Sequence, residues 1–463
     1  MCRPVTEVLH RRRKALRSIS IAAAFLVGVA LLTGCGDAAE DGRIRASDGT
    51  CDGKVPRPTY ITAWFHQGQG PERATLQRQV RAFNAAQDDV IVRLVVFPDL
   101  DFTDEVEAAA AAGELPDVLD FDGPNLYSFA WSGKLRALDS CISPDLRADL
   151  LPSLRSQGTY DGRMWGVGTF DSGLGLYVRP SILRRAGIRI PTGPDDAWTA
   201  SEFTAILETL QDAGYPRPLD LKYTPAAVGR SPEWWTYAYA PVLWSAGADL
   251  VDRDGTGRAV GTLDSPAAVA AMSTVQGWIE AGYLTRDPDV NSGTFVAGKA
   301  PISWLGHWVH GRFKAAHGSD LQLVPLPDFG QGSRSGMGSW QWGITTKARD
   351  GDAAWRFLRF LLSTEEVRRM SDANGAIPGT HSALAGHPAF GSEGDERLYV
   401  EQLDGPTAVP RPQTPAYPAV TREFARAVRG IATGADVQAE LSRAARAIDE
   451  DIREHRGYPP PRP

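Results

Sequence analysis

Tryptophan is the residue type that points most directly to a chemistry in this chain of 463 residues. The grouped members of its 13 tryptophans fall in three short stretches: Trp234, Trp235 and Trp244 with Tyr237 and Tyr239; Trp304 and Trp308; and Trp340 and Trp342. We assign at least half of the tryptophans to packing, because single ones are usually buried. Grouped rings can also bind a sugar, because the C–H face of a pyranose stacks on an indole with about 1–2 kcal/mol per buried ring. Carboxylate, amide and guanidinium groups then bind the sugar hydroxyls and discriminate between epimers.

Other chemistries have weaker support in the sequence. Residues 293–299 match the G-x-x-x-x-G-K pattern of a nucleotide-binding loop, but turn-forming residues precede them and Ala300 replaces the hydroxyl that binds Mg²⁺. No G-x-S-x-G, H-E-x-x-H or C-x-x-C motif occurs, and His307 and His310 have no third metal ligand at an obvious spacing. We therefore expect no catalytic residue, no cofactor and no metal. The many carboxylates leave a glycosidase possible, since that chemistry needs only two of them.

The first 34 residues have the features of a cleaved export signal. A basic stretch precedes the apolar stretch 21–32, which is short for a membrane span. The stretch ends in LTGC, which resembles a bacterial lipobox and predicts lipidation of Cys35; ordinary cleavage is the alternative. Residues 35–56 then form a polar, flexible tether. The chain after the signal has 43 basic and 55 acidic residues, a net charge of −12 that disfavours nucleic-acid binding.

Two of the four cysteines remain for the folded part of the chain. Cys2 leaves with the signal and Cys35 carries the lipid, so that Cys51 and Cys141 are left. Outside the cytoplasm such a pair is most simply a disulfide. Two unpaired buried thiols are the alternative.

The hydrophobic pattern predicts the elements that position the functional residues. Strands at 60–66, 90–97 and 116–121 alternate with helices at 72–87 and 102–112. This alternation is typical of a parallel, doubly wound sheet. Ligands of such sheets bind outside the carboxyl ends of the strands.

Helix signals continue through the rest of the chain. Thr199 and Glu202 predict a capping box at the start of one helix. Further helices are expected at 266–281, 352–362, 364–372 and 436–454. Two Gly-rich segments, 166–175 and 328–338, interrupt the pattern. They suit hinge crossings between two lobes better than a linker between independent domains.

Five segments of the mature chain resemble, in the same order, those of the extracellular solute-binding lipoproteins of sugar ABC importers, the family of maltose- and trehalose-binding proteins. They are LPDVLDFDGPNLYSFAWSGKLRALD (115–139), YDGRMWGV (160–167), FVAGKAPISWLGHW (295–308), GSWQWGIT followed by DAAWRFLRFLLS (338–345 and 352–363), and ANGAIPGTHSAL (373–384). The resemblance extends from about Thr59 to Ile452. It implies that residues 295–300 are the F-x-x-G-K-A helix of that family, followed by a buried strand and a G-x-W turn.

The resemblance implies a type II periplasmic-binding-protein-like α/β fold, with two lobes of doubly wound sheets joined by a three-crossing hinge. We expect lobe 1 at 57–168 plus 337–373, lobe 2 at 173–330 plus 380–455, and hinge crossings near 168–173, 328–338 and 373–380. A sugar bound between the lobes stabilises the closed form, because it contacts both lobes only in that form.

The resemblance also implies a set of ligand-binding residues at strand ends and in loops. They are Gln67, Gln69, Glu72, Asp122 and Asn125 in lobe 1, Trp235, Tyr237 and Trp308 in lobe 2, Trp340 after the second crossing, and Arg411 and Tyr417 in a loop that covers the ligand. Ordinary packing or surface exposure is the alternative for each of them.

We therefore expect a monomeric substrate-binding lipoprotein that captures a di- or oligosaccharide and delivers it to the permease subunits of an ABC transporter. Its lipid is the only expected contact with the membrane, at the outer face of the bacterial cytoplasmic membrane. An extracellular carbohydrate-active enzyme, either a lyase or a glycoside hydrolase, is the main alternative, and a cell-wall adhesin is a third. The sugar, its linkage and the permease do not follow from the sequence.

Overall fold

The computed structural model describes residues 51, 55, 57–98, 102–224, 232–286, 293–338 and 340–460, apart from the side chain of Asp104. The predicted export signal, the lipidated Cys35 and most of the predicted tether lie outside these residues. None of the helices within these ranges is long and apolar enough to cross a membrane.

The first sheet is built from the three strands that the sequence predicts and one strand from much later in the chain. Its order is β12-β3-β1-β2, with β1 (Thr59–His66), β2 (Val90–Phe97), β3 (Val118–Asp122) and β12 (Trp340–Ile344). Strand β1 pairs in parallel with β2 and β3, whereas β12 runs antiparallel to β3. The carboxyl ends of β1 and β3 therefore meet at one edge of the sheet, and the first residue of β12 lies at that edge.

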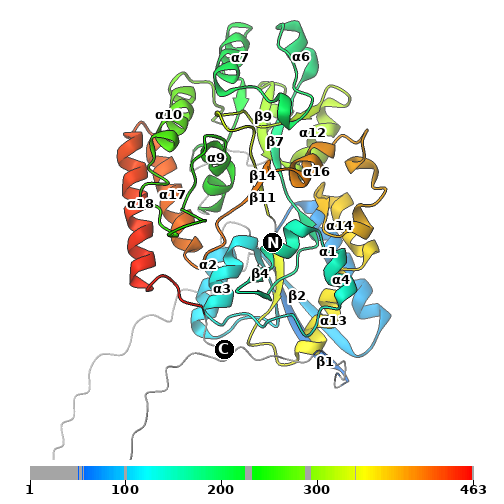
Figure 1. The fold of residues 1–463 in the computed structure, drawn as a ribbon. Helices are drawn as coiled ribbons and strands as arrows, with labels where there is room; N and C mark the ends of the chain where they lie inside the picture. Colours follow the sequence, from blue (N-terminus) through cyan, green and yellow to red (C-terminus); the bar gives the residue numbers. More distant parts are fainter. Residues whose placement is uncertain are drawn as a thin grey trace, which may run out of the picture. The chain divides into compact units, whose positions relative to one another are not determined.

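Helices from both ends of the sequence cover this sheet. They are α1 (Gly70–Ala86), α2 (Phe102–Ala112), α13 (Gly351–Leu361) and α14 (Thr364–Asn374). In α1 the predicted apolar stripe of Leu76, Val80 and Phe83 is buried, as the 3.6-residue period requires. Helices α13 and α14 pack on α1 although they follow it by more than 250 residues (Figure 1).

The second sheet has the order β10-β7-β9-β8, with β7 (Leu174–Val178), β8 (Leu219–Asp220), β9 (Ile302–Gly306) and β10 (Gln322–Val324). It is mixed, because β9 is antiparallel to β7 and parallel to β8. The helices around it are α6 (Pro180–Arg185), α7 (Ala200–Asp212), α9 (Glu233–Ser245), α10 (Pro266–Glu280), α12 (His310–His317), α17 (Tyr417–Ala432) and α18 (Val437–Glu454). A separate hydrophobic core joins this sheet to α7, α9, α10, α17 and α18, which Figure 1 shows in green to red.

Shorter elements connect these layers. The helical ones are η1 (Gly123–Asn125), α3 (Leu126–Trp131), α4 (Pro144–Asp149), α5 (Pro152–Gln157), η2 (Pro194–Asp196), α11 (Gly293–Val296), η3 (His307–Val309), α15 (His381–Leu384), η4 (Pro388–Phe390) and α16 (Arg397–Asp404). The extended ones are β4 (Thr159–Tyr160), β5 (Arg163–Met164), β6 (Phe170–Asp171), β11 (Ser335–Met337), β13 (Ile377–Pro378) and β14 (Ala408–Pro410).

The predicted helix signals at the start of α7 are confirmed. Thr199 caps α7, because its side chain accepts a hydrogen bond from the backbone N–H of Glu202 at 3.1 Å. The carboxylate of Glu202 accepts hydrogen bonds from the guanidinium of Arg189 at 2.6 and 2.7 Å. These bonds, and a hydrogen bond from the backbone N–H of Thr199 that the predicted capping box requires, lower the pKa of Glu202.

The near-match to a nucleotide-binding loop falls where the family resemblance places it. Helix α11 is a single turn, Gly298 adopts a positive φ of 71°, and the fully buried strand β9 follows. The motif therefore precedes a strand, whereas a nucleotide-binding loop follows one and opens a helix. The predicted order of a helix followed by a buried strand is confirmed, but the helix is Gly293–Val296, so residues 297–300 are a turn and not the predicted continuation of the helix.

The three segments predicted as hinge crossings lie beside one another. Strand β6 pairs with β13, and Gly173 bridges to Met337 of β11. The buried carboxylate of Asp171 accepts a hydrogen bond from the backbone N–H of Gly338 at 2.9 Å. Residues from all three predicted crossings are thus hydrogen-bonded together. The described residues belong to one compact unit, so the predicted lobe boundaries stay a prediction.

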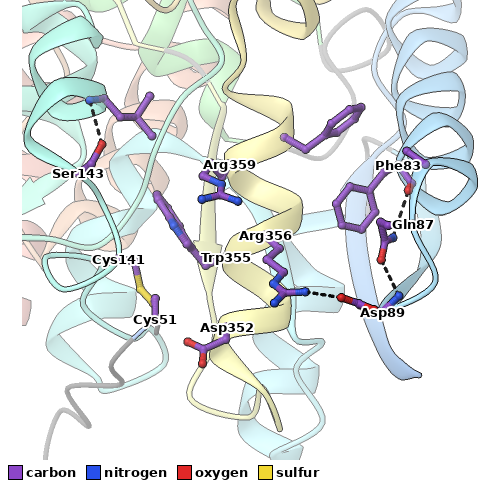
Figure 2. Close-up of a pocket in the computed structure, with 13 residues that line it drawn as sticks. Cys51, Phe83, Gln87, Asp89, Cys141, Ser143, Asp352, Trp355, Arg356 and Arg359 are labelled. Carbon is purple, nitrogen blue, oxygen red and sulfur yellow. Dashed lines mark hydrogen bonds and ion pairs between the residues drawn. A yellow bond between two sulfur atoms is a disulfide. The ribbon is translucent and has the colours of Figure 1, made fainter. Parts of the chain in front are cut away.

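The predicted disulfide between Cys51 and Cys141 is present, with a Cα–Cα distance of 4.9 Å and a sequence separation of 90. It attaches the start of the described chain to the segment before α4. In Figure 2 it lies beside Asp352 and Trp355 at the start of α13.

Candidate functional site

Arg411 is the centre of a buried polar cluster that joins the two sheets. It follows β14, and its side chain is only 3% exposed. Its two terminal nitrogens donate to the two carboxylate oxygens of Asp122 at 2.9 and 3.1 Å. One of them also donates to Glu233, and the other to the backbone carbonyl of Gly338 at 3.3 Å. One guanidinium therefore contacts the end of β3, the start of α9 and the predicted second crossing.

Glu233 is a member of this cluster that the sequence analysis missed. Its carboxylate accepts hydrogen bonds from the hydroxyl of Tyr417 at 2.6 and 2.7 Å and from that of Thr421 at 3.1 Å. Burial raises the pKa of Glu233 to about 7, and the charge of Arg411 opposes that rise. The only sequence signal for Glu233 is its place in the first turn of the helix that carries Trp235 and Tyr237, directly before them.

Aromatic rings lie on the second-sheet side of Arg411. The ring of Tyr237 is 4.9 Å from the Arg411 guanidinium carbon, a distance that permits a cation–π interaction. The ring of Trp308 lies 6.3 Å from Tyr237 and 6.2 Å from Trp234. A Cβ atom on Gly306 would come within 2.1 Å of the Trp308 indole, so the G-x-W spacing exists because only glycine lets the indole lie on the backbone.

On the first-sheet side, Trp340 stacks on a buried histidine. The rings of His66 and Trp340 are 3.4 Å apart with an interplanar angle of 5°. His66 Nδ1 lies 2.5 Å from Asp120 Oδ2, and its Nε2 lies 3.9 Å from a carboxylate oxygen of Glu72. Trp340 is also the direct cross-strand partner of Asp122. The Trp340 group and the Arg411 cluster are therefore contiguous.

The structure thus brings most of the predicted ligand-binding residues into one connected region. The connected members are Glu72, Asp122, Tyr237, Trp308, Trp340, Arg411 and Tyr417. Trp235 is not among them: it is fully buried and packs on Tyr239 in the second core. Helix α9 is apolar on nearly all sides. Its sequence pattern therefore did not show that Trp235 packs in the core whereas Tyr237 faces the cluster.

The remaining predicted residues lie at the ends of the first-sheet strands. Gln67 is exposed directly after β1, and Asn125 is half-buried in η1. Gln69 caps α1, and its backbone N–H donates to Glu72 at 3.2 Å. Glu72 therefore has a structural role at the helix start in addition to its contact with His66.

A cavity of about 630 Å³ lies elsewhere, between α1, α13 and the disulfide (Figure 2). It is lined by aromatic side chains that include Phe83, Trp355 and Phe360, and by the ion pair of Arg356 with Asp89 at 3.1 Å. None of the predicted ligand-binding residues lines this cavity.

Known proteins resemble this chain in sequence and fold. A family model described as bacterial extracellular solute-binding protein matches residues 78–394. A probable sugar-binding periplasmic protein of Brucella suis is 25% identical over 231 residues, which are 48% of this chain and 51% of that protein. A maltotriose-binding protein of Pyrococcus abyssi is 24% identical over 332 residues, which are 69% of this chain and 66% of that protein. The chain therefore spans about half the length of the first of these relatives.

Solved structures share the fold. The crystal structure of the cyclic alpha-maltosyl-1,6-maltose binding protein from Arthrobacter globiformis superimposes with a TM-score of 0.68 and 26% sequence identity, over 86% of this chain and 100% of that chain. The predicted two-lobe, type II α/β fold is thereby confirmed.

Proposed function

Because this chain belongs to the family of bacterial extracellular solute-binding proteins, we propose that it is the ligand-binding component of an ABC importer and that its ligand is a di- or oligosaccharide. The observation that carries this proposal is the Arg411 cluster, in which one guanidinium is held by a carboxylate from each side. The resemblance to sugar-binding relatives supports a carbohydrate as the ligand class.

The chemistry of the cluster suits a polyhydroxylated ligand. Asp122, Glu233 and Glu72 accept hydrogen bonds from hydroxyls, and Arg411 donates to hydroxyl or ring oxygens. Trp308 and Trp340 are both half-buried, so each indole retains a partly exposed surface for stacking on a sugar face. The charged groups bind the hydroxyls at the rim of a sugar ring while the indoles contact its face, and together they orient the sugar.

Ligand binding and lobe closure are linked in this proposal. Asp122 and Trp340 belong to the first sheet, whereas Trp308 and Glu233 belong to elements around the second. A ligand that contacts both sets has its highest affinity for the closed arrangement, so binding shifts the population to that arrangement. Permease subunits then recognise the closed form.

The proposal includes the cellular setting that the sequence predicts. The mature chain is anchored by lipid on Cys35 at the outer face of the cytoplasmic membrane, and residues 36–50 connect the lipid to the folded part. A monomer is sufficient, because a single chain supplies both sides of the ligand site. The protein binds its sugar and does not convert it.

The test is a titration of the mature protein with a panel of di- and oligosaccharides, in which binding is measured by intrinsic tryptophan fluorescence and by calorimetry. We expect a saturable response to at least one sugar, a weaker response in Trp308→Ala and an unchanged affinity in Trp131→Ala. Trp131 is a matched control because it packs against Tyr458 near the chain end. Absence of any response contradicts the proposal, and product formation on chromatography indicates the enzyme alternative.

A further inference from the structure

Asp120 holds His66 at two points. The Oδ2 atom of Asp120 lies 2.5 Å from Nδ1 of His66 and accepts a hydrogen bond from the backbone N–H of His66 at 3.3 Å. Asp120 is fully buried and His66 is 3% exposed, so water does not compete for either contact. Because backbone and ring are bound by one oxygen, the imidazole has little freedom to rotate about its Cα–Cβ bond.

The held imidazole is the surface on which Trp340 lies. The two rings are nearly parallel, at 5°, with centroids 3.4 Å apart. Phe102 closes one side of the pair, at 6.4 Å from the His66 ring and 5.8 Å from the Trp340 ring. Trp340 is half-buried. Its partner on the neighbouring strand is Asp122, whose carboxylate binds Arg411.

We propose that Asp120 is a positioning residue for sugar binding: it fixes His66, and His66 in turn fixes the plane of the Trp340 indole that stacks on the sugar. This inference rests on the proposed function. Stacking depends on the ring plane, and an indole free to rotate would lose side-chain entropy on each binding event. An indole whose orientation is already fixed before the sugar binds avoids this loss of entropy, as in other preorganised sites.

The cost of keeping Asp120 buried supports this role. Its Oδ1 atom has no hydrogen-bond partner among the described residues, and burial raises the pKa of its carboxyl while His66 opposes that rise. A buried carboxylate with one unpaired oxygen destabilises a fold unless its other contacts compensate. The compensating contacts of Asp120 are those to His66, so the pair acts as one unit.

Asp117, the residue directly before β3, provides a matched control. Its carboxylate accepts a hydrogen bond from the backbone N–H of Thr62 at 2.8 Å, at the opposite end of the β1–β3 pair. Asp117→Asn therefore makes the same chemical change in the same sheet, far from Trp340. His66→Gln is a second test variant, because it removes the imidazole and leaves Asp120 in place.

The experiment combines two measurements on the full chain labelled with 5-fluorotryptophan. Fluorine NMR without sugar reports the environment of each of the 13 tryptophans, and Trp340→Phe assigns one resonance. Calorimetry then measures the affinity for the sugar that the wild type binds. We expect Asp120→Asn and His66→Gln to shift or broaden the Trp340 resonance and to weaken sugar binding by up to about tenfold, the cost of ordering one side chain on binding. Asp117→Asn should change neither.

Two results would overturn the inference while the proposed function stands. One is a Trp340 resonance that keeps its wild-type position and width in folded Asp120→Asn and His66→Gln. The other is a sugar affinity that these variants leave unchanged, or that Asp117→Asn lowers equally. A wild-type protein that binds no sugar is a different failure, because it removes the proposed function itself.

Discussion

Replacing Glu396 by glutamine should make the protein more stable at alkaline pH. Glu396 precedes α16, and its side chain is 6% exposed. Its Oε1 atom lies 3.6 Å from His310 Nε2, and its Oε2 atom has no hydrogen-bond partner among the described residues. Burial raises the pKa of Glu396 to about 8, and the nearby charge of Asp395 adds to the rise. Burial lowers the pKa of His310, so a neutral imidazole gives the ionised carboxylate no compensating charge.

The sign of the pH effect follows from this raised pKa. In the unfolded chain the carboxyl ionises near its ordinary value of 4.5, whereas in the folded protein it stays protonated up to about pH 8. Stability contributed by the protonated form is therefore fully present below pH 4.5 and is lost as the pH rises to about 8. This interval corresponds to at most about 5 kcal/mol, at about 1.4 kcal/mol per pH unit. Glutamine has nearly the same shape and cannot ionise, so that loss should vanish.

Urea unfolding followed by tryptophan fluorescence between pH 5 and pH 8.5 measures this effect. The difference in unfolding free energy between Glu396→Gln and wild type should increase by several kcal/mol across the range, in favour of the variant. Glu393→Gln, an exposed site three residues earlier, controls for the change in net charge and should give a flat difference. Parallel pH profiles for Glu396→Gln and wild type would refute the reasoning.

Three further predictions follow from the structure. Arg411→Met leaves the carboxylates of Asp122 and Glu233 without a cation, so it should cost about 3–5 kcal/mol in urea unfolding at pH 8. The cost should be smaller at pH 5, because Arg411 lowers the pKa of Glu233 and its loss therefore penalises the ionised form of that carboxyl most. Equal losses at both pH values would contradict this. Gly306→Ala should displace the indole of Trp308, because its Cβ would lie 2.1 Å from that ring, and calorimetry should show sugar affinity reduced about tenfold. Replacing both disulfide cysteines by serine should lower the unfolding free energy by about 4–5 kcal/mol, because the bridge closes a loop with a sequence separation of 90. A variant that unfolds at the same urea concentration as the oxidised wild type would contradict this prediction.

Three strands of the first sheet and the helices between them were predictable because their residues form these elements through near neighbours in sequence, whereas β12 joins the sheet from residues 340–344 and was not predicted. Alternation of strands and helices between residues 59 and 122, the buried stripe of α1 and the cap at Thr199 all depend on local periodicity or on contacts within one turn. The disulfide was predictable for a different reason, since elimination left a single cysteine pair.

Parts of the candidate site were beyond any local pattern. Glu233 gains its partners from segments about 180 residues away, and Arg411 reaches Asp122 across 289 residues. His66 and Asp120 are 54 residues apart and meet because β1 and β3 are neighbours in the sheet. Trp235 was predicted as a ligand-binding residue, but its neighbours in three dimensions bury it completely.

The sequence by itself determined the residue types available for a sugar site, the identity of most secondary-structure elements and the family to which the chain belongs. These properties depend on composition, short-range periodicity and motif order, all of which are present in the linear chain. Only the tertiary structure decided which carboxylate faces Arg411, which tryptophans pack in a core and which histidine supports Trp340. The physical reason is that burial and charge pairing act through distances in space, and chain folding sets those distances between residues that the sequence keeps far apart.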